Sequence, residues 1–211
     1  MKTCIIIFIT LLIACNPHVS IEIPPEESRN VIISLADSLG TISITLPKRY
    51  DTSFNWTHYS DCNTCHYIKY RVQPKNLPLI KESGWYWREP KDSVERFTIT
   101  HSIFMPSRQI TDSLNIFFQK ERQKEELKRL GQEVLSDTLL RINNTYYSII
   151  RQNFFDTYDT LYKQTLLCGS SIKGNFVNLN FERFSKRPLL NDSFVKNAEY
   201  FLKTISIQKA Q

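Results

Sequence analysis

The sequence has few of the residues that special architectures and reaction sites need. Only 5 of its 211 residues are glycine, which excludes a collagen-like repeat and leaves no glycine-rich loop to cradle a phosphate. It contains no G-x-S-x-G turn to present a nucleophilic serine, and its basic residues form no Lys/Arg block. We therefore expect neither an enzyme nor a nucleic-acid-binding protein.

What the chain does contain is aromatic and aliphatic bulk. It has 13 Phe, 10 Tyr and 3 Trp, and 41% of its residues are hydrophobic, which excludes a disordered chain. The net charge of +6 is spread along the chain with acidic residues between the basic ones, as on an ordinary solvated surface. Without a linker or an internal repeat, residues 30–211 are predicted to form a single domain.

The N-terminus carries the longest apolar run. Lys2 precedes an apolar stretch over residues 4–14, which as a helix rises only about 16 Å against a hydrocarbon core of about 30 Å. The run is too short to span a bilayer, and it matches the hydrophobic region of a secretory signal peptide. We expect residues 1–14 to be that signal peptide.

The end of this run, Leu12-Ile13-Ala14-Cys15, resembles the lipobox of bacterial lipoproteins. The resemblance implies cleavage before Cys15, a diacylglycerol thioether on its sulfur and an acyl chain on the new amine. Several acyl chains on one residue are enough for stable membrane anchoring. Asn16 stands where lipoproteins retained in the Gram-negative inner membrane often carry Asp, so the resemblance points to the outer membrane.

A spacer is expected between the lipid and the domain. Residues 15–29 are rich in Pro and Glu and show no core-forming period. A segment of this composition is semi-extended, and its fourteen residues after Cys15 reach at most about 45 Å. We interpret residues 15–29 as the lipidated N-terminus and a flexible tether.

The first part of the predicted domain reads as strands followed by one helix. Alternation and turn residues predict strands over residues 31–35, 41–46, 54–58, 66–73 and 94–104. Thr111 or Asp112 is suited to cap a helix that runs to about residue 130 and is closed by Gly131. We expect its inner face to consist of Leu114, Phe117, Phe118, Leu127 and Leu130.

The second part returns to strands and ends in a helix. Strands are predicted over residues 139–142, 146–155, 158–168 and 175–184, with Asn143-Asn144 as a hairpin turn. Asn191-Asp192-Ser193 offers caps for a final helix. The expected inner face of that helix is Phe194, Ala198, Phe201, Leu202 and Ile205.

This order of elements predicts an α+β fold in which an antiparallel sheet is flanked by helices. It also resembles the PsbP-like α/β/α sandwich over roughly residues 30–207. The resemblance includes the late pattern Gly174-Asn-Phe-Val-Asn-Leu-Asn-Phe, followed by a helix that ends near Ile205-Ser-Ile. It implies a fold and no activity, because no functional motif of that family matches residue by residue.

The sharpest chemical motif is Cys62-Asn63-Thr64-Cys65-His66. Because an exported chain reaches an oxidising compartment, we expect a local disulfide between Cys62 and Cys65. The alternative is haem c, with Cys62 and Cys65 as thioether attachments, His66 as axial ligand, and a second ligand among Met105, His58 and His101. A redox-active dithiol, a zinc site with His58, and a bond to Cys168 also remain open; Cys168 itself reads as a buried inert thiol.

Three further groups have both a structural and a functional interpretation. Trp85-Tyr86-Trp87 is expected to pack against a sheet edge, or else to form an aromatic platform that contacts a partner or stacks on a sugar. His101 lies in a predicted strand and reads as a hydrogen-bonded structural histidine. Asp156 and Asp159 lie at a hairpin junction, where aspartate is common for turn geometry alone.

Taken together, these features predict a cell-envelope lipoprotein anchored in the membrane through Cys15. The first hypothesis is a non-enzymatic binding or assembly module without a cofactor, whose contact surface is the sheet face or the segment 85–87. The second is a c-type electron carrier that uses Cys62, Cys65 and His66. The third is an immunity or inhibitor protein of the envelope, whose partner is an exported toxin.

Overall fold

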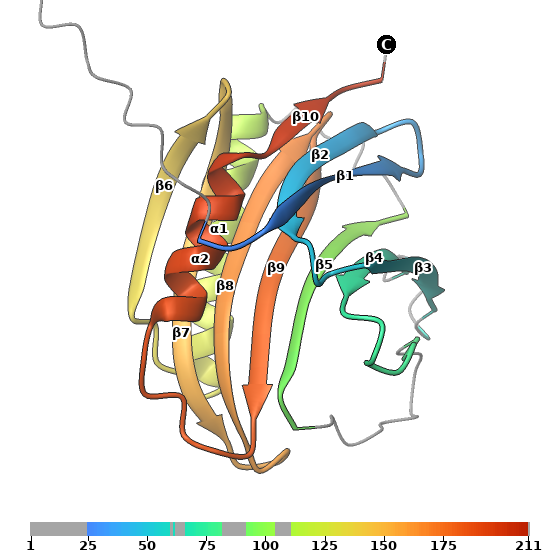
Figure 1. The fold of residues 1–211 in the computed structure, drawn as a ribbon. Coiled ribbons are helices and arrows are strands. Elements are labelled where there is room, and N and C mark those ends of the chain that lie inside the picture. The colour runs from blue at the N-terminus through green and yellow to red at the C-terminus, as the bar shows by residue number, and fades with distance from the viewer. Residues whose placement is uncertain (1–24, 60, 62–65, 82–91, 104–110, 211) are drawn as a thin grey trace, which may run out of the picture.

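The computed structural model of the chain describes residues 25–59, 61, 66–81, 92–103 and 111–210 (Figure 1). Several residues singled out from the sequence lie outside these ranges. They are Cys15, Cys62, Cys65, Trp85, Tyr86, Trp87 and Met105. The lipid anchor, the pairing of the cysteines and the aromatic platform therefore stay predictions.

A small antiparallel sheet contains the first two strands and the last strand of the described chain. It contains β1 (Ser28–Leu35), β2 (Gly40–Pro47) and β10 (Ser206–Gln208), in the order β1-β2-β10. The predicted hairpin of β1 and β2 is confirmed. The expected tether boundary at residue 29 is wrong, because β1 already starts at Ser28 and the Arg29 guanidinium donates to the Tyr50 carbonyl.

The main sheet has seven strands, and every neighbouring pair is antiparallel. Their order across the sheet is β3-β4-β5-β9-β8-β7-β6. The strands are β3 (Thr52–His58), β4 (Tyr67–Gln73), β5 (Val94–Ser102), β6 (Ser136–Ile142), β7 (Thr145–Asp156), β8 (Leu161–Ile172) and β9 (Asn175–Ser185). The α+β class with a mostly antiparallel sheet is thus confirmed.

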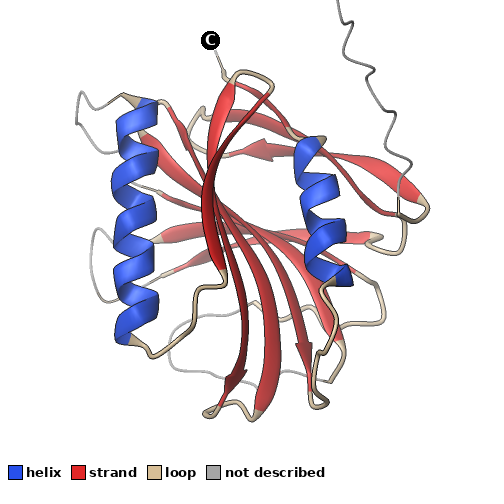
Figure 2. Ribbon diagram, turned by 90° about the vertical axis from the view of Figure 1, so that its left-hand side faces the viewer, coloured by secondary structure: helices blue, strands red, loops and turns tan. Residues whose placement is uncertain are grey.

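Helices lie on opposite faces of this sheet, as Figure 2 shows. α1 (Asp112–Arg129) contacts β7, β8 and β9, whereas α2 (Ser193–Lys203) contacts β8, β9 and β2. Neighbouring residues of β7 point to the two sides. Arg151 forms an ion pair with Glu199 of α2, whereas Gln152 donates to Gln132, just after α1.

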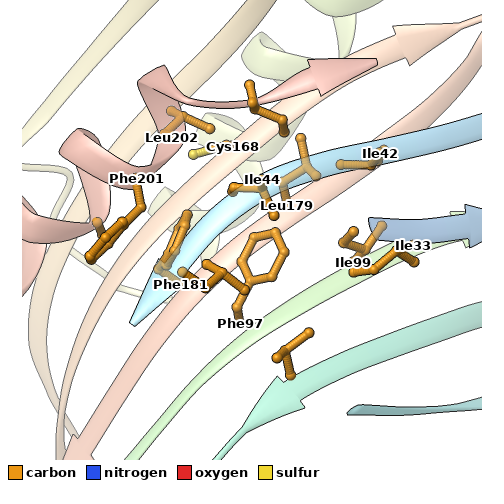
Figure 3. Packing of buried hydrophobic residues seen from close by; sticks show 14 of the residues in the cluster. Ile33, Ile42, Ile44, Phe97, Ile99, Cys168, Leu179, Phe181, Phe201 and Leu202 are labelled. Carbon is orange, nitrogen blue, oxygen red and sulfur yellow. The ribbon is translucent and has the colours of Figure 1, made fainter. Parts of the chain in front are cut away.

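The main hydrophobic core lies between the large sheet and a layer made of α2 and the small sheet (Figure 3). Alternation places one set of side chains from each strand in it, such as Val177, Leu179 and Phe181 of β9. The rings of Phe97 and Phe181 meet at its centre with centroids 4.6 Å apart. The expected inner face of α2 is confirmed in full: Phe194, Ala198, Phe201, Leu202 and Ile205 are buried.

The expected inner face of α1 is wrong. Leu114, Phe117, Phe118 and Leu130 are exposed, and of the predicted set only Leu127 is buried. The side chains that α1 buries are Asn115, Ile116 and Leu127. The reason is that α1 lies over a sheet face with many polar side chains, so hydrogen bonds, rather than the amount of apolar surface, select the side that faces inward.

The structure confirms the interpretation of Cys168 as a buried, inert thiol. Its side chain is fully buried in β8, and burial raises the pKa of the thiol far above its ordinary value. The thiol is free, so the alternative disulfide to Cys62 or Cys65 is not formed.

Candidate functional site: a groove between α1 and the sheet

Hydrogen bonds at the start of α1 position this helix over the sheet. Thr111 caps the helix by accepting from the Leu114 N–H, as the sequence predicted. Asp112 Oδ1 accepts from the Ser171 hydroxyl at 2.8 Å and from the Gly174 N–H at 2.9 Å. Asn115 donates to Ser171 and to the Gly174 carbonyl. The first turn of α1 is thereby tied to the β8–β9 turn.

Asp112 makes this attachment sensitive to acid. Burial alone raises the pKa of its carboxyl, but the bonds from Lys209, Gly174 and Ser171 outweigh burial and lower it below 3.8. A lowered folded-state pKa stabilises the protein above that pH and the contribution is lost as the pH falls through it. Asp112→Asn should therefore flatten the decline in unfolding free energy below about pH 4, measured by urea denaturation across pH; an unchanged pH profile contradicts this role.

Among the described residues, no helix covers one half of the same sheet face. Strand alternation places Tyr67, Lys69 and Arg71 of β4 on the α1 side, together with Thr98 and Thr100 of β5. The equivalent positions of β9 are Asn178, Asn180 and Glu182. The opposite side of the same three strands supplies the core. A polar surface is therefore built directly on the back of the hydrophobic core.

A loop covers this polar surface where β4 ends. The Arg71 guanidinium donates to the Ile80 carbonyl, and the Gln73 amide donates to the carbonyls of Leu77 and Pro78. Arg71 also lies over the Trp56 ring, 4.9 Å from its centroid. These contacts bury Arg71 and close that end of the face.

At the other end the face stays open as a groove along α1. One cavity of about 490 Å³ lies between Gln123, Glu126 and Leu127 of α1 and the sheet. Its sheet side consists of His58, Tyr67, Lys69, Thr100, Leu167, Asn178 and Asn180. A second cavity of about 330 Å³ shares Tyr67 and Asn178 with it and adds Gln119 and Arg122 of α1. Both volumes lie in the range of small-molecule sites.

The amides in the groove are only partly satisfied. Gln123 Nε2 donates to Asn178 Oδ1 at 2.8 Å, which joins α1 to the floor. Asn180 Oδ1 is buried and has no hydrogen-bond partner among the described residues. Leaving a buried acceptor unpaired costs about 1–3 kcal/mol. The Asn180 oxygen therefore gains a bond only when the amide rotates to bring it to a donor.

The charged side chains that line the larger cavity are Lys69 and Glu126. Within the described ranges, no three His, Cys, Asp or Glu residues come together to hold a metal ion. Glu126 is paired with Arg129 on the helix surface, and Lys69 lies over the Trp56 ring.

His58, His66 and His101 differ in their contacts. His101 is buried, and its Nδ1 donates to the Ser102 carbonyl at 2.9 Å, because a carbonyl only accepts. Its Nε2 lies 3.4 Å from the Tyr70 hydroxyl, which accepts from the Ala36 N–H. This confirms a structural histidine. His58 lines the groove, and His66 packs edge-on against the Tyr59 ring.

Asp156 and Asp159 have the structural role in a turn that their sequence position predicts. Asp156 Oδ1 accepts from the backbone N–H groups of Tyr158 and Asp159, which folds the β7–β8 turn. Both carboxylates form ion pairs with Lys163. This turn also explains why β8 starts at Leu161 and not at the predicted residue 158.

The sequence reading missed the groove. Asn178 and Asn180 lie in a segment that the sequence predicts only as a strand, and the glutamines of α1 carry no motif. A signal was nevertheless present: Gln119 and Gln123 are four residues apart, so they share one helix face, and the two asparagines share one strand face. Only the pairing of that helix with that strand brings the four amides together.

Comparisons with known proteins give no family. No protein-family model and no curated protein matches the sequence. A solved structure from Bacteroides thetaiotaomicron aligns with 80% of this chain at 12% identity and a TM-score of 0.41, and the chain spans 45% of that protein. A Pseudomonas aeruginosa protein described as of unknown function aligns with 85% of this chain and 98% of its own, at 5% identity and a TM-score of 0.41. Likenesses at this level carry no functional argument.

Proposed function

We propose that this protein is a lipid-anchored binding module of the cell envelope, without enzymatic activity, that holds its ligand in the groove between α1 and the sheet. The observation that carries the proposal is the open polar floor of Tyr67, Thr100, Asn178 and Asn180, next to a helix that buries amides.

The scaffold is proposed to be a PsbP-like α/β/α sandwich. Two observations support this proposal: the helices lie on opposite faces of the main sheet, and the pattern that follows Gly174 lies in β9, the middle strand of that sheet. Such scaffolds carry many unrelated functions, so the role is argued from the groove.

The anchor is proposed to be the lipid on Cys15. Neither helix in the described part of the chain is long and apolar enough to cross a membrane. The described fold starts only about ten residues after Cys15, a segment that spans at most about 35 Å when extended. Anchoring through Cys15 would therefore keep the groove near the membrane surface, within reach of envelope components.

Photo-crosslinking in cells that export the chain tests the groove without knowledge of the ligand. A diazirine-bearing lysine analogue is introduced at Arg122, which lines the second cavity. The matched control carries the same analogue at Lys128, an exposed residue on the outward side of α1. We expect adducts at position 122 that are absent at position 128, detected by mass spectrometry of the purified protein.

Two controls make the outcome decisive. Gln119→Trp in the same background places a bulky ring in the cavity that Arg122 lines and should remove the adduct while circular dichroism stays unchanged. Equal labelling at positions 122 and 128, or no adduct at position 122, refutes the groove as a binding site.

A further inference from the structure

We propose that the ligand of the groove is a neutral, polyhydroxylated molecule, a glycan segment of the envelope. This inference rests on the proposed function and names the ligand class of the same site. Its basis is the chemistry of the lining, since the surfaces that face the two cavities are mostly uncharged and rich in hydrogen-bonding groups.

The amides are the first part of the argument. A carboxamide both donates and accepts, as each hydroxyl of a sugar does, so one amide satisfies two neighbouring hydroxyls. Gln123 of α1 is hydrogen-bonded to Asn178 of β9. Gln119 lines the second cavity, Asn180 lines the larger one, and Thr100 adds a hydroxyl there. Asn180 Oδ1 lacks a donor, and a sugar hydroxyl supplies one once the amide rotates toward the groove.

Apolar surface is present beside these amides. Tyr67 lines both cavities and is 39% exposed, so its ring is open to contact. Leu127 and Leu167 line the larger cavity. A pyranose ring has C–H faces as well as hydroxyl edges, and an aromatic ring with nearby amides accommodates both.

Charge argues against an anionic ligand. Recognition of a phosphate or carboxylate normally uses clustered or bidentate arginine and lysine. The groove has one lysine in the larger cavity, Lys69, with Glu126 in the same cavity, and Arg122 stands in the other. The charges do not converge on one point.

The strand order argues against a peptide. Extended peptides commonly bind by adding a strand to an open sheet edge. The floor strands β4, β5 and β9 are interior strands with a hydrogen-bonded neighbour on each side, so their backbones offer no such edge. Recognition in the groove has to use side chains.

The adduct captured at position 122 identifies the chemical class of the ligand directly. We expect it to contain sugar residues, seen as monosaccharides after acid hydrolysis and as loss of adduct mass after periodate oxidation. A peptide or lipid adduct overturns the glycan inference and leaves the groove as a binding site. Absence of any groove-specific adduct overturns both.

A binding experiment on the full-length purified protein gives the second readout. The probes are maltotetraose, cellotetraose and chitotetraose, followed by isothermal titration and by NMR shifts of the Asn178 and Asn180 side-chain amides. We expect at least one probe to bind. Loss of one hydrogen bond or ring contact, about 1.4 kcal/mol, should weaken it about tenfold in Asn180→Ala and in Tyr67→Leu.

The matched control is Asn55→Ala, an exposed asparagine of β3 that strand alternation places on the opposite side of the sheet. Its affinity should equal that of the parent protein. If no probe binds and the cellular adduct contains no sugar, or if Asn55→Ala weakens binding as much as Asn180→Ala does, the glycan inference is wrong.

Discussion

Cys15→Ser should abolish both the lipid and the cleavage before residue 15. In the proposed anchor, the thioether and the acylated amine both depend on this cysteine, and one residue with several acyl chains would supply the whole attachment. The described part of the chain offers no helix that spans a bilayer in its place. We expect mass spectrometry to find a lipid-modified N-terminus at residue 15 in the parent protein, and a variant that carries no lipid and retains residues 1–14.

The chain provides its own control for this experiment. Cys4 lies in the same apolar run, but it does not follow the apolar and small residues that a lipobox requires. Cys4→Ser should leave processing and membrane association unchanged. An intact leader on the native protein, or a mature N-terminus elsewhere, refutes the anchor and with it the proposed location.

Phe181→Ala should lower the free energy of unfolding far more than Phe118→Ala. Its ring is buried, packs against Phe97 and lies beside α2 in the middle of the core. Removing a buried phenylalanine ring leaves a cavity and lowers the free energy of unfolding by about 3–5 kcal/mol. The measurement is chemical denaturation in the Cys15→Ser background, which lacks the lipid.

Phe118→Ala is the matched comparison, because the sequence pattern placed Phe118 in the core and the structure leaves it 58% exposed. Surface substitutions of this kind change the free energy of unfolding by about 0.5 kcal/mol or less. A loss similar to that of Phe181→Ala contradicts the orientation of α1 and therefore the groove itself.

Strands and hairpins could be predicted wherever one face is buried. Along β9, apolar and polar residues alternate because the core lies on one side. Asn143 and Asn144 were recognised as a turn because asparagine tolerates positive φ, and both residues have it. The buried face of α2 could be predicted in the same way, since the residues that this helix buries are all apolar.

The buried face of α1 was predicted wrongly because the sheet surface that this helix covers is not apolar. Helix patterns locate the buried side only when the opposing surface is apolar. The sheet surface under α1 is polar and includes Ser171, Asn178 and the Gly174 backbone. The helix forms hydrogen bonds to these groups through Asp112, Asn115 and Gln123. Exposed Phe117 and Phe118 were consequently assigned to the wrong side.

By itself the sequence determined the α+β class, most of the strands, both helices and the expectation of a lipid anchor, because these follow from local periodicity and short motifs. The groove was decided by the tertiary structure alone. Its walls come from β4, β5, β9 and α1, segments far apart in the sequence. Only strand order and helix orientation bring their amides together, and no local pattern encodes either.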